Sequence, residues 1–155
     1  MEREHKYELK IEWTGNNGSG TSGYRDYSRN HTISAAGKET LEGSADPNFH
    51  GEASKYNPEE LFLSALSSCH MLWYLHFCAD ARIIVTSYID KPVGLMSELA
   101  KGGGHFTMVT LHPEIIITDS TKIELAISLH KNAHEKCFIA NSVNFPVTHQ
   151  PTCKV

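Results

Sequence analysis

The strongest structural signal in this chain is the sequence YNPEELFLSALSSCHMLWYLHFCA at residues 56–79. Asn57 offers a side-chain acceptor at the cap of a helix, and Pro58 suits the first helical position. Two glutamates then place negative charge at the positive end of the helix dipole. The sequence therefore predicts a helix that begins at Pro58 and continues to about Ala79.

The predicted helix has no polar face. Residues 61–79 contain no Asp, Glu, Lys or Arg, and apolar residues occupy every side. Such a helix is expected to be buried all round. A membrane span is disfavoured because Ser and His residues interrupt the run and the other segments have the pattern of a soluble domain. Since a 155-residue chain can hardly wrap this helix completely, we expect a second copy to cover the remaining face in a homodimer.

Composition narrows the classes of partner. The 155 residues are 40% hydrophobic and 21% charged, with a formal net charge of -4, which fits one domain over residues 1–155. Without clustered Lys and Arg, neither nucleic acid nor a membrane surface is an expected partner. The charged residues at 1–6 lack the apolar stretch of a signal peptide, so the cytoplasm is the expected compartment. Four cysteines without a Cys-x-x-Cys pair favour free or catalytic thiols.

The remaining segments predict an α+β fold with antiparallel pairing, because strands and helices do not alternate as βαβ units. Alternating apolar residues predict a strand over 7–13 with one buried face. Residues 43–56 are expected to form an ordered loop, and helical spacing returns from 121 to about 136. The other predicted strands are 24–33, a short one after 36–38, 83–89, 106–118 and an edge strand over 145–154.

The cysteines differ in their positions on these elements. Cys69 and Cys78 are nine residues apart on one helix, so they face opposite sides about 13 Å apart and cannot pair within it. Cys137 ends the second helix, where it has more freedom to approach a partner and leave again. Cys78 and Cys153 are interpreted as buried structural residues. His70 is also interpreted as structural, because adjacent helical residues diverge by about 100° and its ring should point away from Cys69.

A metal site is one alternative. His130, His134 and Cys137 recur at i, i+4 and i+7, a spacing that metal ligands can use, and His149 could supply a fourth ligand. With ten histidines in the chain, accidental pairs at this spacing are common, and solvated surface histidines explain the pattern more simply. We therefore assign no residue to a metal and expect no cofactor.

Two stretches resemble the osmotically inducible protein C and organic hydroperoxide resistance (OsmC/Ohr) family. They are residues 56–72, where a cysteine follows Asn-Pro-Glu-Glu-Leu, and CFIANS at residues 137–142. The resemblance implies an OsmC-like fold with antiparallel sheets around a long central helix. It also implies an intertwined homodimer with two active sites at the subunit interface. In these sites Cys69 would attack the peroxide, Cys137 would resolve the product, and Glu59 would orient a catalytic arginine.

The arginine is the residue on which this sequence departs from the family pattern. Many members carry it in the loop before the Asn-Pro-Glu segment, but residues 46–51 contain none. Other members carry it near the second strand, where this chain has Arg25 and Arg29. We favour Arg29, with His50 as a possible substitute. A guanidinium would stabilise the thiolate and donate hydrogen bonds to the departing oxygen, while a carboxylate pins its planar fork.

The resulting hypothesis is a thiol peroxidase. Cys69 would be oxidised to a sulfenic acid, which condenses with Cys137 to a disulfide before further oxidation. The family resemblance implies recycling by a small dithiol such as a lipoyl group. The non-enzymatic alternative is a dimer whose interface pocket binds an apolar ligand. Apolar residues near the cysteines favour an organic hydroperoxide as the substrate: Phe62, Leu66, Met71, Trp73 and Phe138.

Overall fold

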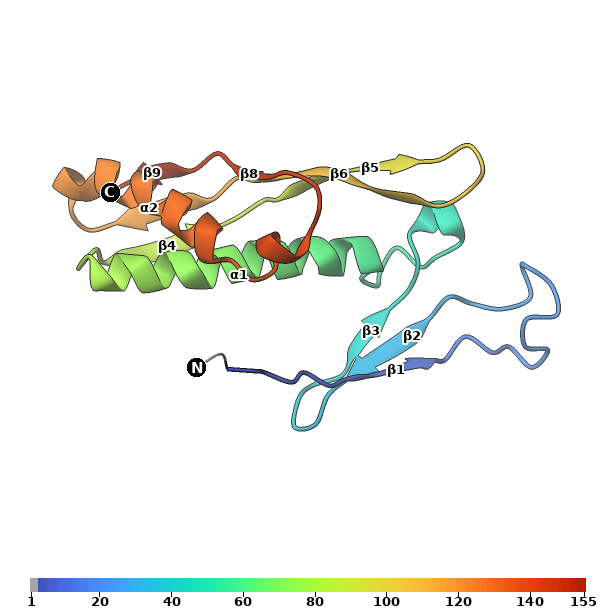
Figure 1. Cartoon of the computed structure of the whole chain (residues 1–155). Helices are drawn as coiled ribbons and strands as arrows, with labels where there is room; N and C mark the ends of the chain where they lie inside the picture. Colours follow the sequence, from blue (N-terminus) through green and yellow to red (C-terminus); the bar gives the residue numbers. More distant parts are fainter. Residues whose placement is uncertain (1–2) are drawn as a thin grey trace. The chain divides into compact units, whose positions relative to one another are not determined.

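The computed structural model describes residues 3–155. The chain folds as two compact units, the first ending at Leu61 and the second comprising Phe62–Val155 (Figure 1). The boundary lies in the first turn of the long helix α1, Pro58–Asp80.

The first unit is built on a three-stranded antiparallel sheet in the order β1-β2-β3. The strands are β1 (Lys10–Trp13), β2 (His31–Ser34) and β3 (Leu41–Gly43). The predicted strand over 24–33 is therefore mostly wrong. Residues 24–27 instead form turns and bends, and the Arg29 guanidinium donates to the carbonyl oxygens of Tyr24 and Tyr27, each at 2.7 Å. Such side-chain bonds to the backbone compete with strand pairing.

The apolar face expected for the first strand is exposed in the single chain. Tyr7, Leu9, Ile11 and Trp13 retain 90%, 64%, 57% and 44% of their accessible surface. Both clusters of buried hydrophobic residues lie in the second unit, so the first sheet has no such cluster to cover this face. The prediction of alternation was right, but the expected burial is not achieved within one chain.

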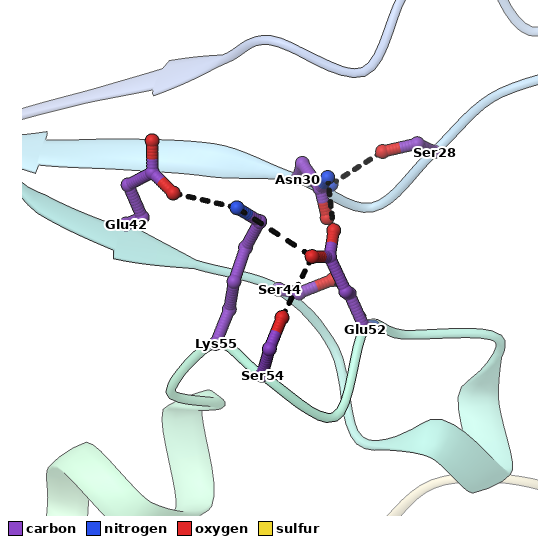
Figure 2. A network of polar contacts seen from close by, with 7 residues as sticks. All are labelled: Ser28, Asn30, Glu42, Ser44, Glu52, Ser54 and Lys55. Atoms are coloured by element: carbon purple, nitrogen blue, oxygen red, sulfur yellow. Dashed lines mark hydrogen bonds and ion pairs between the residues drawn. The ribbon is translucent and has the colours of Figure 1, made fainter.

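Polar contacts order the loop at residues 43–56, as predicted (Figure 2). The Lys55 ammonium lies 2.6 Å from the Glu42 carboxylate on β3 and 3.8 Å from that of Glu52. The Asn30 amide donates to Glu52 at 2.8 Å, which joins the loop to the end of β2. A further backbone bridge pairs Gly43 with Tyr56. These bonds fix the segment that leads into α1.

The helix α1 confirms the prediction at its N-terminus and at its length. The Asn57 side chain accepts a hydrogen bond from the Glu60 backbone N–H at 2.8 Å, and the Glu60 carboxylate accepts one from the Asn57 N–H at 3.1 Å. This reciprocal pair is a capping box, which satisfies two N–H groups that the helix leaves unpaired. Because Glu60 makes the box, Glu59 is not needed for capping.

Within one chain, α1 is buried along a single stripe, in line with the expectation that one chain cannot cover the helix completely. Leu66, His70, Tyr74 and Cys78 are its buried residues, at a spacing of four, while Leu72 on another side is 63% exposed. Its length and mean hydropathy of 1.2 would also suit a membrane span, a property that core helices share. The stripe instead packs on the sheets of the second unit.

Two three-stranded sheets form the second unit, in the orders β4-β7-β9 and β5-β6-β8. The predicted antiparallel pairing joins β4 to β7 and β5 to β6, and parallel pairs add β9 to β7 and β8 to β6. The predicted strand over 106–118 is two strands broken at His112-Pro113, and 145–154 gives two edge strands in different sheets. The strands are β4 (Val85–Ile89), β5 (Val93–Glu98), β6 (Gly104–Leu111), β7 (Glu114–Ile117), β8 (Val147–His149) and β9 (Thr152–Lys154).

The helix α2 (Ile123–Lys136) confirms the second predicted helix and packs in one core with α1. This core joins Tyr74 and Cys78 of α1 to Ile115 and Ile117 of β7 and to small residues of α2. A second core joins Leu66 of α1 to β6. Since α1 belongs to both cores, it runs along both sheets of this unit (Figure 1). Short 3-10 helices are Pro47–Phe49, Ser120–Lys122 and Ala140–Ser142.

Candidate active site

The second unit brings Cys69 and Cys137 together, although 68 positions separate them in the sequence. Cys69 is half-buried near the middle of α1, and Cys137 is 1% exposed at the C-cap of α2. The two side chains lie close enough for Cys69 to contribute to the raised pKa of Cys137. All four cysteines of the chain are free thiols, so this pair is in the reduced state.

The environment of Cys137 keeps it protonated. Burial raises the pKa of the Cys137 thiol to about 11, and the neighbouring Cys69 acts in the same direction. The Ala140 N–H donates to the Cys137 sulfur at 3.4 Å, which opposes part of this effect. A thiol at Cys137 is a poor first nucleophile at neutral pH. The half-buried Cys69 is therefore the better candidate for direct reaction with a small molecule.

The other two cysteines lie apart from this pair. Cys78 is 1% exposed in the core with Tyr74, and burial raises the pKa of its thiol. Cys153 on β9 is half-buried against the same core, and burial raises its pKa as well. Both positions agree with the structural role that the sequence suggested.

Glu59 is the second residue of α1, ten positions before Cys69. Because α1 is unbroken from Pro58 to Asp80, the rise between them is about 15 Å. This excludes a break in α1 that would fold Glu59 back on Cys69 of the same chain. The two side chains do not meet within one helix.

The three candidates for the catalytic cation share one cavity in the first unit. Arg25, Arg29 and His50 line it together with Asn17, Tyr27 and Ser28, and its volume is about 430 Å³. The Arg29 guanidinium lies 4.5 Å and 4.2 Å from the ring centroids of Tyr24 and Tyr27, and both carbonyl oxygens hold it. His50 adopts a left-handed backbone, φ 62°, with its ring against Tyr24. Arg29 is the best fixed of the three cations.

A pair of buried histidines links the two cysteine-bearing helices. His70 Nε2 and His130 Nδ1 are 2.9 Å apart, and both side chains are buried, at 1% and 0% exposure. His70 thus points to α2 rather than to Cys69, as expected from its position on the helix. The His70–His130 contact itself was not predicted, since it joins residues 60 positions apart.

The same geometry argues against the metal hypothesis. Within residues 3–155, no group of three or more His, Cys, Asp and Glu side chains is arranged to hold a metal ion. His130 Nδ1 is engaged with His70. The rings of His134 and His149 lie at a centroid distance of 5.8 Å, tilted by 42°. In the described residues, His130, His134 and Cys137 are not brought into such a group.

We predict that acidification destabilises the fold through this histidine pair. Burial, together with a smaller contribution from neighbouring histidines, lowers the pKa of His70 to about 4 and that of His130 to about 3. Below pH 6.5 the unfolded chain therefore binds protons that the folded chain refuses. The free energy of unfolding should fall by about 2 kcal/mol per histidine between pH 7 and pH 5, as urea titrations can measure. An unchanged free energy over this interval would contradict the prediction.

Similar proteins were found by family profile and by structure. The profile described as OsmC-like protein matches residues 51–152. An OsmC-like protein of unknown function from Vibrio cholerae is 33% identical with a TM-score of 0.86, covering 96% of this chain and 100% of that one. No curated protein matches the chain.

More distant structures show the same fold. An organic hydroperoxide resistance protein from Elizabethkingia anophelis is 21% identical with a TM-score of 0.67, over 98% of this chain and 99% of that one. One from Legionella pneumophila is 18% identical with a TM-score of 0.64, over 98% of this chain and 100% of that one.

Proposed function

Because this chain belongs to the OsmC-like protein family, we propose that it is a cysteine-based thiol peroxidase that reduces organic hydroperoxides. The observation that carries the proposal is the proximity of Cys69 and Cys137, whose side chains interact although 68 positions separate them in the sequence. The greater burial of Cys137 supports the order of reaction that we propose. Cys69 attacks, and Cys137 resolves.

The reaction has two steps. The Cys69 thiolate attacks one oxygen of the hydroperoxide, the O–O bond breaks, and the other oxygen leaves and takes a proton as the alcohol. Cys69 is then a sulfenic acid. The Cys137 sulfur attacks the Cys69 sulfur, water leaves with the hydroxyl oxygen, and a disulfide forms. An external dithiol such as a lipoyl group supplies two electrons and two protons to restore both thiols.

Among the candidates Arg25, Arg29 and His50, we propose Arg29 as the catalytic cation. Its guanidinium is always charged and is held by two carbonyl oxygens and two tyrosine rings, so little conformational freedom is lost when it binds an oxyanion. In this proposal Glu59 pairs with the guanidinium and keeps its donors aimed at the peroxide.

Aromatic side chains beside the two cysteines support an organic substrate. Trp73 follows Cys69 by one helical turn, and Phe138 follows Cys137 directly. Their ring centroids are 5.8 Å apart, and Phe138 is 70% exposed. An alkyl or aryl hydroperoxide would bury its apolar group against them. Leu66, which the sequence suggested for the same role, instead lies in the core at 1% exposure.

We also propose that two copies pair as a homodimer. The helix α1 has no charged residue between 61 and 79 and exposes Leu72, and β1 exposes Ile11 and Trp13 at 57% and 44%. Such apolar surface is rarely left to water in a monomer. A second copy of the chain, related by a two-fold axis, would cover it.

One equivalent of cumene hydroperoxide should produce a Cys69–Cys137 disulfide, because these two side chains already lie close together. Cys78 and Cys153 should stay reduced, since each is held in or against the core. Peptide mapping by mass spectrometry after alkylation distinguishes the pairs. Recovery of all four thiols in reduced form would sink the peroxidase proposal, and a dominant disulfide to Cys78 or Cys153 would overturn the assignment of Cys137.

A further inference from the structure

The buried contact between His70 and His130 ties together the two helices that bear the reactive thiols. His70 follows Cys69 directly on α1, and His130 precedes Cys137 by seven positions, two turns of α2. Seven residues return a helix to nearly the same face, so His130 and Cys137 share one side of α2. A shift of the histidine contact therefore shifts the two sulfurs.

The two imidazoles are held in a fixed arrangement. Their rings are nearly coplanar, with an interplanar angle of 9°, as suits a hydrogen bond in the ring plane. The Tyr74 ring stacks on His130 with a centroid distance of 3.9 Å. The His149 ring of β8 lies against both imidazoles, with centroid distances of 5.5 Å to the His70 ring and 5.9 Å to the His130 ring.

The burial of His130 also indicates which nitrogen donates. His130 Nε2 is buried and makes no hydrogen bond. A buried N–H without an acceptor is costlier and rarer than an acceptor without a donor. The favoured arrangement therefore leaves Nε2 unprotonated, and His130 Nδ1–H donates to His70 Nε2. This bond requires His70 Nε2 to be unprotonated.

We propose that His70 and His130 are positioning residues that hold the Cys69 and Cys137 thiols at the separation needed for disulfide formation, an inference that rests on the proposed function. The apolar contacts of α2 in the shared core, from buried Ala126 and Ala133 and partly buried Ile123 and Leu129, are not directional. The histidine bond is directional and fixes the register of α1 against α2. Neither histidine needs to touch the peroxide.

The test measures how well the two thiols are held together, without any peroxide. In a glutathione redox buffer, the Cys69 and Cys137 thiols and one glutathione disulfide give the protein disulfide and two glutathione thiols. The equilibrium constant is the effective concentration of one protein thiol at the other. It reports positioning in the folded state, so it is independent of whether the protein reduces hydroperoxides.

Two variants remove the histidine bond in different ways. The double variant His70→Leu/His130→Leu replaces both partners by apolar groups, a change that can be nearly neutral for stability. His130→Phe keeps an aromatic ring to stack on Tyr74 but removes the donor. In both we expect the effective concentration to fall about 10-fold to 100-fold. His130→Asn, which retains a nitrogen near the place of Nδ1, should recover most of the loss.

The matched control is His76→Gln on the same helix, an exposed residue whose ring lies 3.4 Å from Asp80. Its effective concentration should equal that of the unmodified protein. Circular dichroism verifies that each variant is folded. If the effective concentration is unchanged in either folded variant, His70→Leu/His130→Leu or His130→Phe, the inference is overturned. If the unmodified protein has a high effective concentration but is oxidised by no hydroperoxide, only the peroxidase proposal is overturned.

Discussion

Replacing Cys69 by serine should lower the rate of hydroperoxide reduction at least about 1000-fold, because the nucleophile of a covalent mechanism has no substitute in the site. A serine hydroxyl is not ionised at neutral pH and cannot form a sulfenic acid. The loss is measured as the alcohol released per protein with a dithiol present. Cys153→Ser is the matched control, because Cys153 is half-buried on β9, and its activity should stay near that of the unmodified protein.

Cys137→Ser should have a different effect, which identifies the order of the two thiols. The first step is intact, so one equivalent of alcohol is released at the normal rate. Cys69 then remains as a sulfenic acid that excess peroxide converts to the sulfinic acid. Intact mass measurements follow both products. Equal single-turnover rates in the Cys69→Ser and Cys137→Ser proteins would contradict the assigned roles.

The sequence predicts α1 well because local chemistry determines it. The cap at Asn57, the proline after it and the uncharged run have no reading other than a long apolar helix. The family resemblance carried by the same residues is confirmed by the profile match, and the α+β fold is confirmed by the Vibrio cholerae structure. Helix signals of this kind depend on neighbours in sequence rather than on distant contacts.

The strands are predicted less well, because their pairing depends on contacts that sequence patterns do not contain. Residues 93–98 contain Gly94 and few β-branched residues, and they form β5 only by pairing with β6. The edge segment over 145–154 reads as one strand, yet its ends join different sheets in parallel. Proline at 146 and 151 correctly indicated an edge position.

The candidate site divides in the same way. The choice of Cys69 and Cys137 came from the family resemblance, and the structure adds their proximity. The His70–His130 pair was missed because helical spacing shows which face a histidine occupies but not what packs on that face. One signal was available. His70 is at four-residue spacing with Leu66 and Tyr74, so it belongs to a buried stripe.

Glu59→Ala should lower hydroperoxide reduction about 10-fold to 100-fold, the effect expected when a charge-assisted hydrogen bond of about 1.5–3 kcal/mol to the catalytic cation is lost. The unbroken α1 places Glu59 about 15 Å from Cys69 along the axis, so the Glu59 that serves a given Cys69 is expected to come from the partner subunit. This requires a dimer, and light scattering should return about twice 17.3 kDa. A folded monomer at micromolar concentration would exclude a Glu59 supplied by the partner subunit.

Mixed dimers distinguish a Glu59 that acts across the subunit interface from a Glu59 that acts within its own chain. A Cys69→Ser subunit paired with a Glu59→Ala subunit should retain one intact site, and therefore about half of the normal activity, if Glu59 acts across the interface. If Glu59 served its own chain, both sites would be damaged and activity would be near zero. The reciprocal dimer pairs an unmodified subunit with a Cys69→Ser/Glu59→Ala subunit, and its outcomes are reversed. If Glu59 acts across the interface, the only Cys69 in this dimer faces an alanine, and activity should be low. Half of the normal activity in this dimer would assign Glu59 to its own chain.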